Sequence, residues 1–165
     1  MKVHLDGETL TRYRDAQKWI AEVWNFFGNE RSQQSFWELA LNVSDIVWEA
    51  SERNSFFPPQ NLREWLKLPI NNKPSHLWVL PYAFKSVEEV IKSHGLDSPR
   101  FRKFVDEQLM ITAQSTASET PFLFGAPALT YTNYSNYYVP GGLIKMVDEI
   151  ASFVRKKGGS LHTKE

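Results

Sequence analysis

Apolar residues recur at helical spacing along much of the chain, a pattern that predicts amphipathic helices. The clearest helix runs from residue 14 to residue 27 and stops at Gly28, because glycine readily adopts the backbone conformation of a helix end. In the next helix, near residues 32–51, apolar side chains cover most of the circumference, so this helix should be central in the fold or lie against a further partner. Additional helices are predicted near residues 86–94, 99–116 and 120–129.

The N-terminal residues predict a β-hairpin. Asp6-Gly7 separates two short segments, residues 3–5 and 8–13, that read as strands. The Asp-Gly pair supplies the positive φ angles that a tight two-residue hairpin turn requires. The sequence therefore predicts an antiparallel pair of strands before the first helix.

The C-terminal part predicts a strand-helix-strand arrangement. A strand at residues 137–139 is followed by the turn Pro140-Gly141-Gly142, a helix over residues 143–154 and a strand at residues 160–163. The last strand has no later strand to pair with, and we interpret it as the cut edge of a larger fold, since natural sheet edges are normally covered. The predicted fold class is α+β: a single, mainly helical domain over residues 1–165, with a short β-hairpin and the C-terminal strand-helix-strand.

Charge and cysteine content exclude several functional classes. The 19 Lys and Arg residues balance the 19 Asp and Glu residues, so the basic excess that favours nucleic-acid binding is absent. Without cysteine, the chain can form no disulfide, no thiolate zinc site and no cysteine nucleophile. The apolar stretches are too short to span a bilayer. We expect a cytoplasmic protein, with peripheral membrane contact as an open possibility.

The usual motifs for catalysis and cofactor binding are missing. The eight glycines form neither G-x-G-x-x-G nor a phosphate loop, and the four histidines lack metal-binding spacing. No serine lies in a G-x-S-x-G motif. We therefore predict no metal site and no catalytic residue. The glycine turn before the last helix allows two interpretations: an anion contact at the helix N-terminus, or simply a tight turn.

Aromatic residues are concentrated near the end of the chain. Such a group can line a cavity for a long apolar ligand, or form an ordinary aromatic core whose tyrosine hydroxyls are hydrogen-bonded, and both interpretations stay open. The group consists of Phe122, Phe124, Tyr131, Tyr134, Tyr137 and Tyr138.

The order of the motifs in the second half resembles a known family. The segment TPFLFGAPAL at residues 120–129 precedes YYVPGG at residues 137–142, a helix, and KGGSLHT at residues 157–163. This order resembles the interior of FAD-dependent oxidoreductases of the phytoene dehydrogenase type, which include carotenoid desaturases and isomerases. The N-terminal hairpin with Asp6-Gly7 and the helix after it are also similar to this family.

The resemblance implies that the chain is the substrate-side insert of a two-domain flavoprotein. Family members carry flavin-binding regions before and after this part, so FAD would belong to the full-length parent, and the fragment alone would be inactive and free of cofactor. Its partners would be an apolar, polyene-like substrate and the flavin-binding domain of the same parent chain. The resemblance implies a flavin-proximal turn at Pro140, Gly141 and Gly142, and substrate-binding roles for Phe122, Phe124, Leu129, Tyr137 and Tyr138.

A different functional class also fits the sequence. A free-standing module without catalytic activity could use the same aromatic residues to bind a lipid, a membrane or a protein partner. In the excised-insert interpretation, the isolated chain exposes the apolar surface that would face the flavin domain and the unpaired strand at residues 160–163, so we expect it to self-associate.

Overall fold

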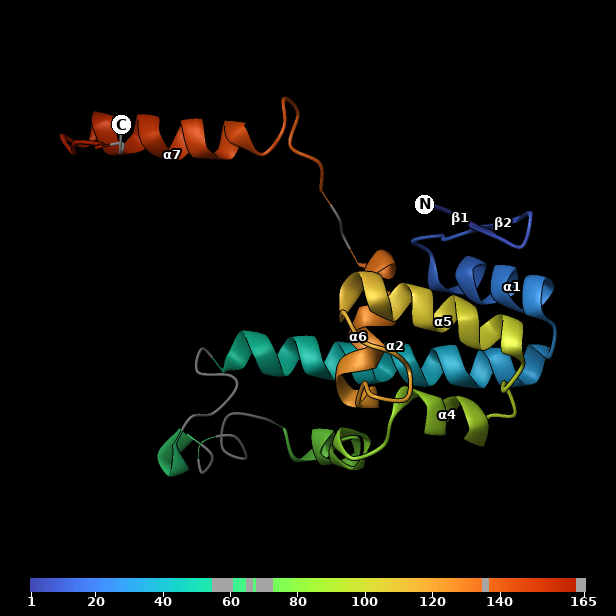
Figure 1. The fold of residues 1–165 in the computed structure, drawn as a ribbon. Coiled ribbons are helices and arrows are strands. Elements are labelled where there is room, and N and C mark those ends of the chain that lie inside the picture. Colours follow the sequence, from blue (N-terminus) through green and yellow to red (C-terminus); the bar gives the residue numbers. More distant parts are fainter. Residues whose placement is uncertain (55–60, 65–66, 68–72, 135–136, 163–165) are drawn as a thin grey trace. The chain divides into compact units, whose positions relative to one another are not determined.

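The computed structural model describes residues 1–54, 61–64, 67, 73–134 and 137–162, and the chain forms two compact units (Figure 1). The first unit comprises residues 1–134 and the second residues 135–165. The predicted single domain spans both units. No helix in the described part of the chain is both long and apolar enough to cross a membrane.

The predicted hairpin is confirmed. Strand β1 (Lys2–Leu5) pairs antiparallel with β2 (Glu8–Thr11), and the turn residues Asp6 and Gly7 have φ angles of 50° and 84°. Leu5 and Leu10 are buried beneath the hairpin. Since a two-stranded hairpin is marginal by itself, this burial against the helices is what gives it stability.

Ion pairs fasten the tip of the hairpin to helix α5 (Pro99–Thr112). Lys103 Nζ lies 3.0 Å from a carboxylate oxygen of Asp6, and Arg100 forms an ion pair with Glu8. The Asp6 carboxylate raises the pKa of Lys103. All four side chains are substantially exposed, so each pair contributes little stability on its own.

Helix α2 (Glu30–Arg53) is central in the first unit, as its apolar circumference predicted. It packs against α1 (Ala16–Phe27) and α6 (Phe122–Thr130), and α6 packs in turn against α5 (Figure 1). Trp19 of α1 meets Trp37 of α2 edge to face, with ring centroids 5.0 Å apart. The largest fully buried aromatic side chains are Trp19, Phe36, Trp37, Phe101, Phe104 and Phe122.

Short-range signals set several helix boundaries. Ser98 caps α5 by accepting a hydrogen bond from the Phe101 amide, and Pro99 occupies the first turn, as the sequence suggests. The helix predicted to reach residue 116 ends at Thr112 instead. Gln114 has a φ angle of 53°, in the left-handed region, so the backbone cannot continue as a right-handed helix there.

The apolar stretch before α4 (Val87–Ser93) forms a ten-residue 3-10 helix, η1 (Pro74–Ala83), which the sequence pattern did not predict. In a 3-10 helix, residues three apart lie in one row. The row of His76, Val79 and Tyr82 faces inward, whereas Leu77 and Trp78 in the other two rows are exposed. A second short 3-10 helix, η2 (Tyr131–Asn133), follows α6.

The second unit contains helix α7 (Ile144–Lys156), in the predicted place. The strands predicted on either side of it are wrong for the residues that the structure describes. Residues 137–139 and 160–162 are not in strands, and Thr163 lies outside the described residues. Tyrosine and valine favour strands only where a neighbouring strand supplies hydrogen bonds and packing, and the described part of this unit supplies none. The β part of the α+β fold is therefore the N-terminal hairpin.

The packing around α6 gives a first prediction. A Cβ atom added at Gly125 would lie 2.3 Å from Cγ2 of Val87, so we expect Gly125→Ala to lower the free energy of unfolding by about 1–3 kcal/mol despite the better helix propensity of alanine. Urea denaturation of the full chain measures this. Adding Val87→Ala should recover part of the loss, and strictly additive effects of the two changes would contradict a steric cause.

Candidate functional site

The predicted substrate-binding residues occupy three kinds of environment. Phe122 and Leu129 are fully buried in the first unit, where the ring centroids of Phe122 and Tyr82 lie 5.3 Å apart. Phe124, on the same helix, is 48% exposed. Tyr137 and Tyr138, in the second unit, are 88% and 81% exposed. Phe122 and Leu129 therefore help to build the aromatic core, whereas the other three are surface side chains.

The Pro140-Gly141-Gly142 turn has a backbone that only glycine adopts easily. Gly141 and Gly142 have φ angles of 88° and 85°, and the Gly142 amide donates to the carbonyl of Val139 at 2.9 Å. A Cβ atom at Gly141 would lie 3.0 Å from Cγ of Lys145, whereas one at Gly142 would meet no atom within 4 Å. The need for glycine at residue 142 is thus purely conformational within this chain.

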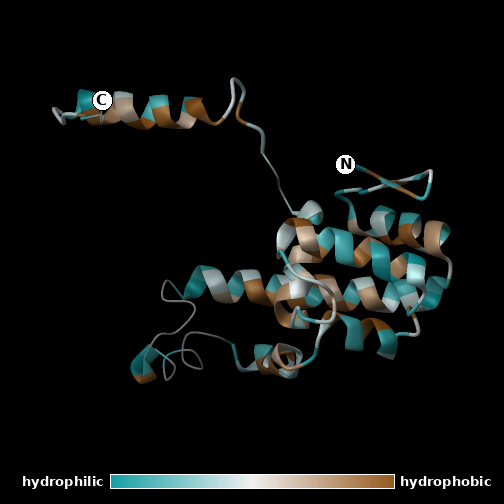
Figure 2. Ribbon diagram, viewed as in Figure 1, coloured by the Kyte–Doolittle hydropathy of each residue, from teal (hydrophilic) through white to brown (hydrophobic). Residues whose placement is uncertain are grey.

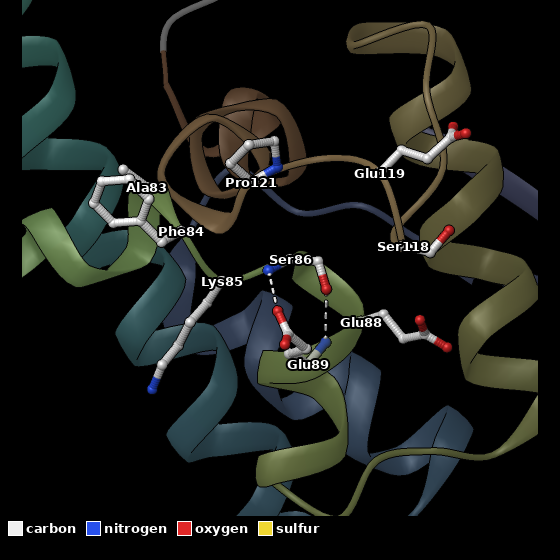
Figure 3. A pocket seen from close by; sticks show the side chains of 9 residues that line it. All are labelled: Ala83, Phe84, Lys85, Ser86, Glu88, Glu89, Ser118, Glu119 and Pro121. Atoms are coloured by element: carbon white, nitrogen blue, oxygen red, sulfur yellow. Dashed lines mark hydrogen bonds between the residues drawn. The ribbon is translucent and has the colours of Figure 1, made fainter.

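A hollow of about 470 Å³ lies between the end of η1, the start of α4 and residues 118–121 (Figure 3). Backbone hydrogen bonds hold these segments together: the Val87 amide donates to Thr120, and the Phe122 amide donates to Lys85. The hollow is lined by Ala83, Phe84, Lys85, Ser86, Glu88, Glu89, Ser118, Glu119 and Pro121.

The carboxylates of this hollow already have hydrogen-bond partners. Glu89 accepts from the Ser86 amide at 2.6 Å while Ser86 Oγ accepts from the Glu89 amide, which forms a capping box at the start of α4 (Figure 3). Hydrogen bonding to the Glu89 carboxylate from the Ser86 backbone amide, and then from the Ser86 hydroxyl, lowers the pKa of Glu89. Glu88 forms ion pairs with Lys92 and Arg102, and Glu119 accepts hydrogen bonds from neighbouring hydroxyls.

The walls of the hollow are therefore mixed in polarity, and the charged groups serve the local structure. A long apolar ligand would leave these carboxylates poorly solvated, so the hollow suits a small polar molecule better. A smaller hollow of about 150 Å³ lies beside it, lined by Leu39, Tyr82, Lys85, Glu89, Val90, Ser93 and His94. Within the described residues, no group of three or more His, Asp or Glu side chains could hold a metal ion.

The most unusual buried side chain, Arg12, was not identified from the sequence. It lies just after β2, and its side chain is 3% exposed. The available signal was the two-residue period of the hairpin, because Leu10 and Arg12 project to the same side and Leu10 is apolar. From the sequence alone, an arginine at such a position is interpreted as a solvent-exposed residue of a sheet edge. Its hydrogen-bond acceptors lie on distant helices and are known only from the structure.

Comparison with protein-family models, with curated proteins and with solved structures finds no match for this chain. The family resemblance therefore depends on its motifs alone. The described residues do not fit FAD by themselves, since the turn Gly141-Gly142 is followed by α7 without the G-x-G-x-x-G pattern that holds a dinucleotide phosphate.

The capping box gives a pH-dependent prediction. Because the pKa of Glu89 is lowered in the folded state, its ionised form stabilises the fold above the pKa of glutamate in the unfolded chain. This contribution is lost as the pH falls through the lowered pKa of the folded state. We expect Glu89→Gln to reduce the melting temperature near pH 7 and the difference from wild type to close in acid.

Thermal denaturation between pH 3 and pH 7 would measure this difference, and melting curves at steps of about half a pH unit would locate the change. The exposed Glu107, on α5, provides the control variant Glu107→Gln. A stability difference for Glu89→Gln that stays constant over this pH range would show that the ionised carboxylate is not the stabilising species.

Proposed function

We propose that this chain is the substrate-binding part of an FAD-dependent oxidoreductase of the phytoene dehydrogenase type that acts on an apolar, polyene-like substrate. The motif order TPFLFGAPAL, YYVPGG, helix and KGGSLHT supports this proposal. In it, the redox chemistry belongs to FAD held by a flavin-binding domain of the parent protein, and this chain shapes the substrate side. The proposed location is the cytoplasm, with peripheral membrane contact.

The single observation that carries the proposal is the glycine turn before α7. Two consecutive residues, Gly141 and Gly142, have positive φ angles, a backbone conformation that glycine adopts at little cost. The two glycines of the PGG motif are therefore the residues that this turn needs. Gly142 has free space around its missing Cβ within this chain. Such a turn allows a planar group or a substrate to approach the backbone closely, which is the role that the resemblance implies for it.

The exposed apolar side chains of α7 are a second supporting feature. Helix α7 carries apolar and polar residues on different sides, which is visible as alternating brown and teal along it in Figure 2. None of its residues is buried. In the proposed parent protein, the flavin-binding domain covers this apolar side, whose exposed residues are Ile144, Met146, Val147, Ile150 and Phe153.

The same helix favours one alternative function, a lipid- or membrane-binding module without catalytic activity. An apolar side accompanied by basic residues is typical of helices that lie in a membrane interface. In α7 the basic residues are Lys145, Arg155 and Lys156, and Lys157 follows directly. Asp148 and Glu149 offset part of this charge, so the apolar side would supply most of the binding energy.

Purification of the protein that the whole natural gene encodes would distinguish the two functions. We expect the purified protein to retain FAD, seen as flavin absorbance after desalting, and to oxidise an acyclic polyene supplied in detergent micelles. The isolated chain of 165 residues should retain no flavin. A protein from the natural gene that lacks flavin but co-sediments with phospholipid vesicles would contradict the oxidoreductase proposal and support the alternative.

The turn gives a sharper prediction in the flavin-containing protein. Alanine at residue 142 meets no steric contact, and its positive φ angle costs about 1–2 kcal/mol of stability. Gly95 is a matched control, with a φ angle of 69° and equally open space in the cap after α4. We expect Gly142→Ala to lower turnover per folded molecule about tenfold or more and Gly95→Ala to leave it unchanged.

Melting temperature and turnover should be measured on the same preparations of both variants. Equal stability losses with unequal turnover would indicate that the turn lies against flavin or substrate. If turnover falls only in proportion to the unfolded fraction for both variants, the turn has no role beyond its own conformation.

A further inference from the structure

The guanidinium of Arg12 joins three elements of the first unit. Nη1 donates to Oε1 of Gln108 on α5 at 2.9 Å, and Nη2 donates to the carbonyl of Leu129 near the end of α6. Nε donates to Oγ1 of Thr132 in η2 at 3.1 Å. The hydrogen bonds of one side chain thus connect the end of the hairpin, α5 and the junction between α6 and η2.

This buried cation has no carboxylate partner among the residues that the structure describes. Aromatic faces and a helix end replace it: the guanidinium carbon lies 4.3 Å from the centroid of Trp19 and 6.0 Å from that of Tyr131. The Leu129 carbonyl belongs to the last turn of α6, where the helix dipole is negative. Burial lowers the pKa of Arg12 to about 10, so the group remains charged at neutral pH.

A second polar cluster holds the same junction from α2. Oγ of Ser44 lies 2.7 Å from Oγ1 of Thr130, and the Thr130 hydroxyl also donates to the carbonyl of Ala126 at 2.9 Å. The Tyr134 hydroxyl donates to Asp45 at 2.8 Å, and burial raises the pKa of that hydroxyl. The end of α6 and η2 are therefore held by hydrogen bonds from Arg12 and from side chains of α2, and Arg12 is itself bound by Gln108 of α5.

Buried polar groups of this kind stabilise a fold less than apolar side chains of similar size, but they specify one arrangement. Here they converge on residues 129–134, the last described residues of the first unit before the tyrosine and Pro-Gly-Gly segment. We propose that Arg12 is a positioning residue, which fixes the junction between α6 and η2 and thereby the point from which that segment continues. Its effect on turnover rests on the proposed oxidoreductase function.

The variant Gln108→Met tests the positioning role with little change in packing volume. It leaves Arg12 Nη1 without its acceptor in a buried site, so amide hydrogen exchange at residues 129–134 should accelerate about tenfold or more. Gln33→Met is a matched control, because Gln33 is also buried in a helix and accepts a hydrogen bond, from Trp37 Nε1 at 3.1 Å. Gln33→Met should leave exchange at the junction unchanged.

Arg12→Lys tests whether the planar guanidinium group is required. Lysine keeps the charge but cannot donate to three acceptors in the geometry of a guanidinium, so it should accelerate exchange at the junction as Gln108→Met does. Wild-type protection in Arg12→Lys, or equal acceleration in the Gln108→Met and Gln33→Met variants, would overturn the proposal.

Activity provides the second readout in the protein from the natural gene. We expect Gln108→Met to lower kcat for polyene oxidation per folded molecule about tenfold, with KM little changed, and Gln33→Met to lower neither. Wild-type kcat in Gln108→Met despite faster exchange would overturn the positioning role. Absence of flavin and oxidation from the wild-type protein would instead refute the proposed function, while the exchange data would still decide whether Arg12 fixes the junction.

Discussion

The packing of α6 against α2 is the constraint on which the first unit depends. Phe122 of α6 and Phe36 of α2 are fully buried, with ring centroids 6.0 Å apart, and Gly125 permits α4 to approach through Val87. Because α6 also contacts α5 and η1, its position determines where those elements lie. The hydrogen bonds at the far end of α6 then fix the position of this helix along its axis. Aromatic packing alone specifies that position less strictly, because dispersion contacts are less directional than hydrogen bonds.

Local signals in the sequence identify much of this unit. The Asp6-Gly7 turn and the Ser98-Pro99 cap act within a few residues, so their geometry follows from residue type alone. The central place of α2 also follows from its sequence, because apolar residues over most of a helix circumference need neighbours on more than one side; α2 contacts α1, α6 and η1, while Trp48 in its second half stays 46% exposed. These features need no information about distant residues.

Features that depend on tertiary partners were not predictable in the same way. The residues of η1 are apolar in a run that periodicity cannot assign, and their arrangement in rows depends on packing of Tyr82 against Phe122. The strand expected at residues 137–139 has the right composition but no described partner strand. Of the candidate site, the glycine turn could be predicted, since positive φ angles favour glycine. The surroundings of Arg12 could not, because they involve residues about a hundred positions away.

The two ends of the hairpin are fastened by interactions that respond differently to ionic strength. At the tip, Glu8 and Asp6 form solvent-exposed ion pairs with Arg100 and Lys103, and dissolved ions weaken such surface pairs as the salt concentration rises. At the base, Arg12 is excluded from solvent and bound by neutral acceptors and aromatic rings, which salt hardly affects. Rising salt therefore weakens the ion pairs at the turn, whereas the buried Leu5 and Leu10 and the hydrogen bonds of Arg12 keep the strand pair attached to the helices.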